Sequence, residues 1–93
     1  MVRLNASAGA PFEVALGSAP STGYQWEPVQ LPPGVALLST RFEQPPSAAI
    51  GDGGTQFFTL QAAAAGRLTL NFVLKRRWEA QGVQSRAVEV EVA

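Results

Sequence analysis

Apolar and other residues alternate along the chain in several short segments. In one of them Phe12, Val14 and Leu16 are each separated by a single residue. A period of two residues is typical of a β-strand with one face against a core. This pattern, or a run of aromatic and β-branched residues, predicts strands at residues 2–4, 12–16, 24–26, 35–42 (with a bend near Ser39), 55–60, 68–74 and 88–92.

No segment has a helical period of 3.6 residues. The most helix-prone stretch is LQAAAAG, residues 60–66, which is rich in alanine but short and ends in glycine. Isolated helices of this length are marginal in water, so we interpret the stretch as a strand end and a turn. About seven short strands separated by Gly, Pro and Ser clusters predict an all-β fold, an immunoglobulin-like antiparallel β-sandwich, in a single domain over residues 1–93.

Three of the predicted connections are expected at the same end of this sandwich. They are residues 18–24, 45–55 and 76–85, the second, fourth and sixth connections along the chain. If each strand runs opposite to the one before it, every second connection emerges at the same end. The alternation therefore predicts a surface made of three loops at one pole of the domain.

Composition excludes most catalytic chemistry. The 93 residues include no Cys and no His, and seven acidic residues balance seven basic ones. The absence of Cys excludes a thiol nucleophile and Cys-based metal sites, and the absence of His removes the commonest general base and metal ligand. Carboxylates or Lys could still serve, but the chain has only seven Asp and Glu residues and one Lys. We therefore expect no enzyme activity, no metal and no cofactor. The zero net charge also gives no reason to expect a nucleic-acid partner or an anionic membrane.

The chain shows no segment for membrane insertion or export. It contains no run of the ~18 apolar residues that a membrane-spanning helix requires. Met1 leads almost directly into VRLN, without the apolar core of a signal peptide. This pattern fits a cytoplasmic protein, or a periplasmic or secreted one from which a leader has been removed.

The first two loops are rich in small residues. SAPSTGYQW, residues 18–26, holds Pro20, which fixes its own φ, and Gly23, which permits a positive φ or the close approach of another backbone. It also fits a plain turn leading into a strand whose Trp26 belongs to the core. PPSAAIGDGG, residues 45–54, is either a flexible connector or an edge on which a partner's backbone can pair. Its GDGG lacks the Lys-Ser/Thr pair and the helix of a phosphate-binding loop.

The third loop begins with three cations and a tryptophan, KRRW at residues 75–78. Three adjacent cations usually form a solvated patch, and on a neutral chain they are a weak indication of nucleic-acid binding. Trp78 follows the end of the alternating pattern, so we predict that it is exposed. An exposed Trp beside Arg is typical of an interface hot spot. Alternatively, Trp78 covers the end of the core or stacks with an arginine.

The motifs PSTGYQW, GDGG before a strand, and RRW occur in this order. Together they resemble the chagasin-type inhibitors of papain-family cysteine proteases. The usual motifs of that family are Asn-Pro-Thr-Thr-Gly-Tyr/Phe-x-Trp, a glycine-rich second loop and Arg-Pro-Trp. This chain differs at Ala19, where Asn is usual, at Ser21, where Thr is usual, and at Arg77, where Pro is usual. These differences bear on affinity and target range rather than on the general function.

The resemblance implies an immunoglobulin-like sandwich whose three loops fill the cleft of a papain-like cysteine protease, endogenous or foreign, and block it reversibly. The first loop would lie over the catalytic Cys, the glycine-rich segment would bind along the non-primed side, and Trp78 would pack on the primed side. The inhibitor is expected to be a monomer. The protease-binding residues implied by the motifs are Pro20, Ser21, Thr22, Gly23, Tyr24, Gly51, Asp52, Gly53, Gly54, Arg76, Arg77 and Trp78.

An immunoglobulin-like architecture alone does not determine function. The alternative is therefore a binding module that recognises a protein, a peptide or a carbohydrate. A stripe of exposed aromatic residues on a sheet face would favour that alternative. The aromatic residues here lie mostly in core register, with Trp78 as the exception.

Overall fold

A computed structural model describes residues 2–18, 24–44, 53–76, 78 and 82–93 of the chain. These residues contain no helix, and so none that could cross a membrane. Each predicted strand is present, and the alanine-rich residues 60–66 form a strand end and a turn, as predicted. The seven strands are β1 (Val2–Ala6), β2 (Pro11–Ser18), β3 (Tyr24–Val29), β4 (Val35–Glu43), β5 (Gly54–Ala62), β6 (Gly66–Arg76) and β7 (Gln84–Val92).

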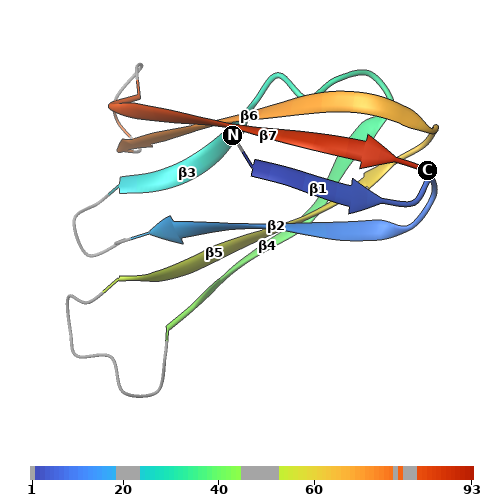
Figure 1. Cartoon of the computed structure of the whole chain (residues 1–93). Coiled ribbons are helices and arrows are strands. Elements are labelled where there is room, and N and C mark those ends of the chain that lie inside the picture. Colours follow the sequence, from blue (N-terminus) through green and yellow to red (C-terminus); the bar gives the residue numbers. More distant parts are fainter. Residues whose placement is uncertain (1, 19–23, 45–52, 77, 79–81) are drawn as a thin grey trace.

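The strands form two sheets that pack face to face (Figure 1). One sheet has the order β1-β7-β6-β3 and the other the order β2-β5-β4. Neighbouring strands are antiparallel except β1 and β7, which are parallel, with Val2 opposite Val88. The all-β, immunoglobulin-like sandwich is thus confirmed, with this one parallel pair as a departure from a purely antiparallel arrangement. The parallel pair is consistent with alternating strand directions, because six reversals separate β1 from β7.

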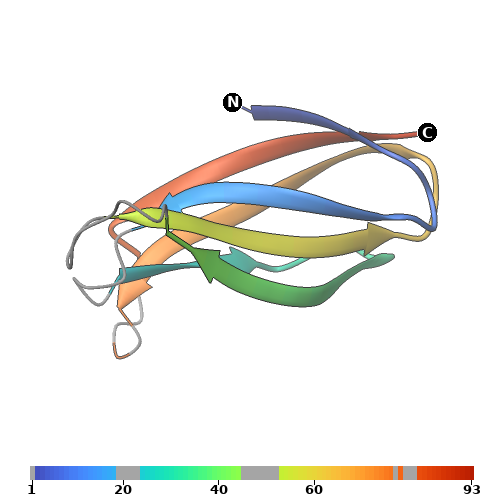
Figure 2. The same ribbon diagram turned by 90° about the horizontal axis from the view of Figure 1, so that it is seen from below.

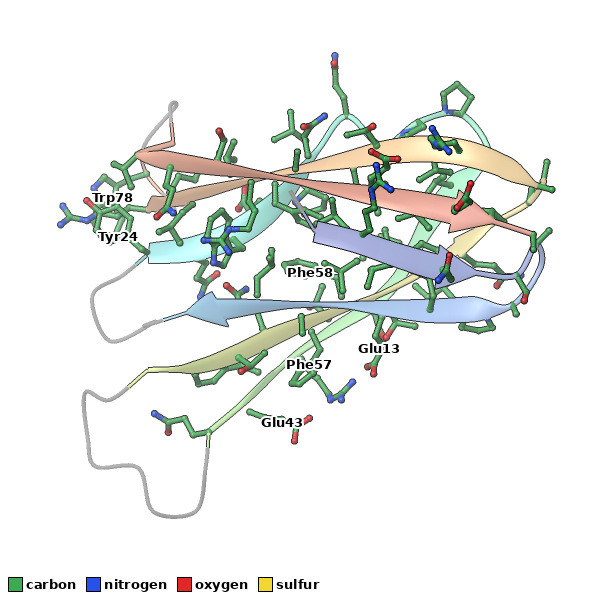
Figure 3. The ribbon with its side chains drawn as sticks, in the orientation of Figure 1. Glu13, Tyr24, Glu43, Phe57, Phe58 and Trp78 are labelled. Atoms are coloured by element: carbon green, nitrogen blue, oxygen red, sulfur yellow. The ribbon has the colours of Figure 1, made fainter. Side chains whose placement is uncertain are left out.

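The core lies between the sheets and follows the alternation in the sequence. Leu70 and Phe72 of β6, and Val88 and Val90 of β7, have no exposed surface. Phe58 comes from the other sheet (Figure 3). It packs on Phe72, with 5.0 Å between the ring centroids. Successive side chains of a strand point to opposite faces, so each strand contributes every second residue to this core.

Strand β4 departs from the buried pattern. It pairs only with β5 and forms one edge of its sheet (Figure 2). Its apolar residues Leu37, Leu38 and Phe42 are between 38% and 49% exposed. The register shifts between Leu37 and Ser39, close to the predicted bend. A bulge of this kind interrupts the regular hydrogen-bonding edge that another chain could extend.

The outer sheet faces carry ion pairs. On the β2-β5-β4 face, Arg41 pairs with Glu13 and Glu43, and its guanidinium carbon lies 4.2 Å from the centroid of the Phe57 ring (Figure 3). The hydrogen bonds that the Arg41 guanidinium donates to the Glu13 and Glu43 carboxylates raise the pKa of Arg41 above its ordinary value. Within the described residues, neither outer face shows the uncovered aromatic stripe expected of a binding module.

Candidate functional site

Six strand ends meet at one end of the sandwich, which we call the loop pole. Strands β2, β4 and β6 end there, and β3, β5 and β7 begin there (Figure 1). The three connections of interest leave and re-enter the sandwich at this pole, as the alternation predicted. The terminal pairs of the ladders show the arrangement: Ser18 with Gly54, Tyr24 with Arg76, and Glu43 with Thr55.

The predicted contact residues fall into two groups. Those that the structure describes are Tyr24, Gly53, Gly54, Arg76 and Trp78. Those that lie outside the described residues are Pro20, Ser21, Thr22, Gly23, Gly51, Asp52 and Arg77. The described group comes from both sheets and lies entirely at the loop pole, so the fold brings together residues more than fifty positions apart in the sequence.

Two aromatic rings and one guanidinium group form a cluster at this pole. Tyr24, the first residue of β3, lies opposite Arg76, the last residue of β6. The Arg76 guanidinium carbon is 4.6 Å from the centroid of the Tyr24 ring and 5.8 Å from that of Trp78. Tyr24 and Arg76 are half-buried, whereas Trp78 is 74% exposed. Figure 3 shows Tyr24 and Trp78 at the same end of the sandwich. Trp78 is therefore exposed, as predicted, and is also within cation–π range of an arginine.

Trp26 joins the two sheets beneath this cluster. It is 4% exposed, which confirms its assignment to the core. Its indole N–H donates a hydrogen bond to the carbonyl oxygen of Gly17 in β2, at 2.7 Å. Its backbone N–H donates to Oε1 of Gln56 in β5, at 2.8 Å. Since Trp26 is two residues from Tyr24, these bonds hold the start of β3 against the strands that border the first and second loops.

Gln56 had no signal in the sequence that marked it as a partner of Trp26. It lies in TQFFTL, a segment whose residues predict only a strand. A side chain 30 positions from Trp26 becomes its hydrogen-bond partner only when the two sheets are packed together.

Gly54 is required by packing within the domain. A Cβ atom at this position would overlap the backbone oxygen of Glu43 and would lie 2.6 Å from an atom of the Phe42 ring. The glycine therefore has a role in the fold, beside the predicted approach of a partner's backbone. Phe42 and Val83 are 39% and 60% exposed close to this pole. Val83 belongs to the predicted third loop, residues 76–85, but neither residue was among the predicted contact residues.

The loop pole is suited to binding a partner. The described residues contain no group of His, Cys, Asp or Glu that could hold a metal ion. The pole instead presents a highly exposed tryptophan beside an arginine, the residue types that dominate interface hot spots. Arg76 is the last residue of a paired strand and Trp78 follows two residues later, so the sheet restrains the arginine and lowers the ordering cost of binding.

Comparison with known proteins gives a family and a fold. A family model described as "Chagasin family peptidase inhibitor I42" matches residues 5–92. Among solved structures, the cysteine protease inhibitor EhICP2 from Entamoeba histolytica is similar, with a TM-score of 0.75, 20% identity, and coverage of 98% of this chain and 85% of that one. The solution structure of amebosin gives a TM-score of 0.68 and 22% identity, with 98% and 88% covered. No curated protein sequence matches.

Proposed function

The chain belongs to the chagasin family of peptidase inhibitors, and we propose that it inhibits papain-like cysteine proteases by inserting the loop pole into the active-site cleft. Membership of the family makes the chain a protease inhibitor rather than an enzyme, with a cysteine protease as its partner. The proposal adds the papain-like target and the surface that makes the contact.

One observation carries this choice of surface. Trp78 is 74% exposed at the same pole from which the first and second loops leave the sandwich. The Arg76 guanidinium lies beside this exposed indole, and Trp and Arg are the residue types enriched in interface hot spots. The motif that contains Trp78 is also one of the three on which the resemblance to the family depends.

The three loops at the loop pole would fill the active-site cleft together, as a single wedge. Pro20 to Tyr24 would lie over the catalytic Cys, where Thr22 and Gly23 are small enough to enter the narrow centre of the cleft. The segment around Gly53 would pair with the protease backbone along the non-primed side. Interfaces of standard size use about 20–30 residues from each partner, and the three loops together supply roughly that number.

The inhibition would be reversible, and the inhibitor would not be cleaved. A good substrate presents an extended peptide whose carbonyl is aimed at the nucleophile and the oxyanion donors. A loop whose two ends are fixed by β2 and β3 does not need to adopt that geometry. We also propose that the inhibitor acts as a monomer, and the bulge on edge strand β4 supports this.

A titration of three proteases tests the proposal. The chain is titrated against papain, a cathepsin L-like enzyme and trypsin, at several substrate concentrations. We expect competitive inhibition of the first two and no inhibition of trypsin, with intact inhibitor recovered by mass spectrometry after prolonged incubation. Failure to inhibit either cysteine protease, or steady cleavage of the chain, would contradict the proposal.

A further inference from the structure

We propose that Arg76 and Tyr24 are positioning residues, which hold the Trp78 indole in one orientation before a protease binds. The inference rests on the proposed function, because it assigns these residues a task within the same surface. It differs from the motif-based interpretation, in which Tyr24 and Arg76 contact the protease themselves.

Trp78 depends on its neighbours at the loop pole for a fixed orientation. It lies two residues beyond the end of β6, and the core covers little of it, since 74% of its surface is exposed. The Arg76 guanidinium, 5.8 Å from the centroid of the indole ring, is within the cation–π range of about 6 Å. This contact gives the exposed indole a preferred position.

Arg76 is itself held by the sheet. Its backbone is paired with Tyr24, and its guanidinium lies 4.6 Å from the centroid of the Tyr24 ring. Tyr24 is half-buried and is fixed through β3 by the hydrogen bonds of Trp26 to the other sheet. A planar guanidinium stacks on aromatic rings better than an ammonium group does, so arginine suits this role better than lysine. The core therefore fixes Tyr24, Tyr24 restrains the Arg76 guanidinium, and the guanidinium restrains the Trp78 indole.

Positioning has a measurable consequence for binding. An exposed indole without support samples several rotamers, and a protease must select one of them when it binds. Arg76→Met keeps most of the aliphatic stem and removes the guanidinium. We expect it to raise the inhibition constant for papain roughly fivefold, in line with an exposed cation–π contact. Arg76→Lys should raise the constant less.

A double-mutant cycle separates positioning from direct contact. If Arg76 acts through Trp78, Arg76→Met should have almost no effect in a Trp78→Ala background. An equal loss in both backgrounds would show that Arg76 contacts the protease directly and would overturn the inference. Tyr24→Leu removes the ring beside the Arg76 guanidinium and should resemble Arg76→Met in both backgrounds.

A measurement on the free protein makes the inference independent of inhibition. The chain carries two tryptophans, so 5-fluorotryptophan labelling gives two fluorine resonances, which Trp78→Phe assigns. Arg76→Met should shift or broaden the Trp78 resonance and leave that of Trp26 in place. The matched control is Arg86→Met, because the Arg86 guanidinium carbon lies 5.7 Å from the centroid of the Trp26 ring. This control should perturb only the Trp26 resonance.

Failure of the positioning role and failure of the proposed function give different experimental results. A Trp78 resonance that Arg76→Met leaves unchanged, in a protein whose circular dichroism is that of the wild type, would overturn the positioning role. Wild-type protein that inhibits no cysteine protease would overturn the proposed function, whatever the resonances show. The Arg76→Lys variant repeats the fluorine measurement with a smaller change if Arg76→Met does not fold.

Discussion

The two tryptophans allow the same substitution to be made at a contact residue and at a core residue. Trp78 is 74% exposed at the loop pole, and Trp26 is 4% exposed between the sheets. Replacement by alanine removes an indole in each case. We expect Trp78→Ala to weaken inhibition while the domain stays folded, and Trp26→Ala to destabilise the whole domain.

The expected magnitude for Trp78→Ala follows from its exposure. A tryptophan buries up to about 250 Å² when fully covered. With 74% exposed, about 185 Å² of Trp78 is available to a partner. At about 25 cal/mol per Å² this area corresponds to an upper limit of about 4.5 kcal/mol. If the protease covers half of that area, the loss is about 2 kcal/mol, or roughly thirtyfold in affinity.

The covered part of the Trp78 surface limits the effect of Trp78→Ala on the free energy of unfolding. The covered quarter of Trp78, about 65 Å², contributes less than about 1.6 kcal/mol to the free energy of unfolding. Trp26→Ala removes a buried indole and the hydrogen bond that its N–H donates to Gly17 of the other sheet, and large core truncations of this kind cost about 3–5 kcal/mol. The two variants should therefore differ clearly in stability.

Both quantities are measured on the same preparations. Urea unfolding followed by circular dichroism gives the free energy of unfolding, and titration against papain gives the inhibition constant. The assignment of Trp78 as a contact residue is refuted if Trp78→Ala loses as much stability as Trp26→Ala while its folded fraction inhibits papain as strongly as the wild type. That result would make Trp78 part of the core.

Three further predictions concern the surroundings of the loop pole. Gly54→Ala should lower the free energy of unfolding by about 1–3 kcal/mol, because the added methyl overlaps the β4 backbone and the Phe42 ring. In the double variant, Phe42→Ala removes that ring and should restore part of the lost stability, as measured by thermal unfolding. Gln56→Leu removes the side-chain acceptor of a partly buried backbone N–H of β3 and should cost about 1–3 kcal/mol in urea unfolding. Gln61→Leu, which removes an exposed bond at the other end of the sandwich, is the control and should cost less than half as much. Arg67→Gln breaks exposed ion pairs at that same far end and should change the inhibition constant by less than about twofold.

The strands and the division of the two tryptophans could be predicted from the sequence. Alternation at residues 12–16 and 68–74 identifies core faces directly, because a strand turns every second side chain to the same side. The loss of that alternation after β6 indicated that Trp78 is exposed. Counting reversals was enough to predict that the three loops share a pole, since that argument needs only the number of strands.

The pairings and contacts between distant segments required the folded structure. The parallel pairing of β1 with β7, and the bond between Trp26 and Gln56, join residues far apart in the sequence. The crowding of Gly54 by Phe42 and the approach of Arg76 to Tyr24 are likewise contacts between distant segments, and alternation within a segment does not identify its partner. Alternation reports how each residue relates to its immediate neighbours in the chain. Which surfaces meet depends on how two sheets close around a common core, and that is a property of the whole chain.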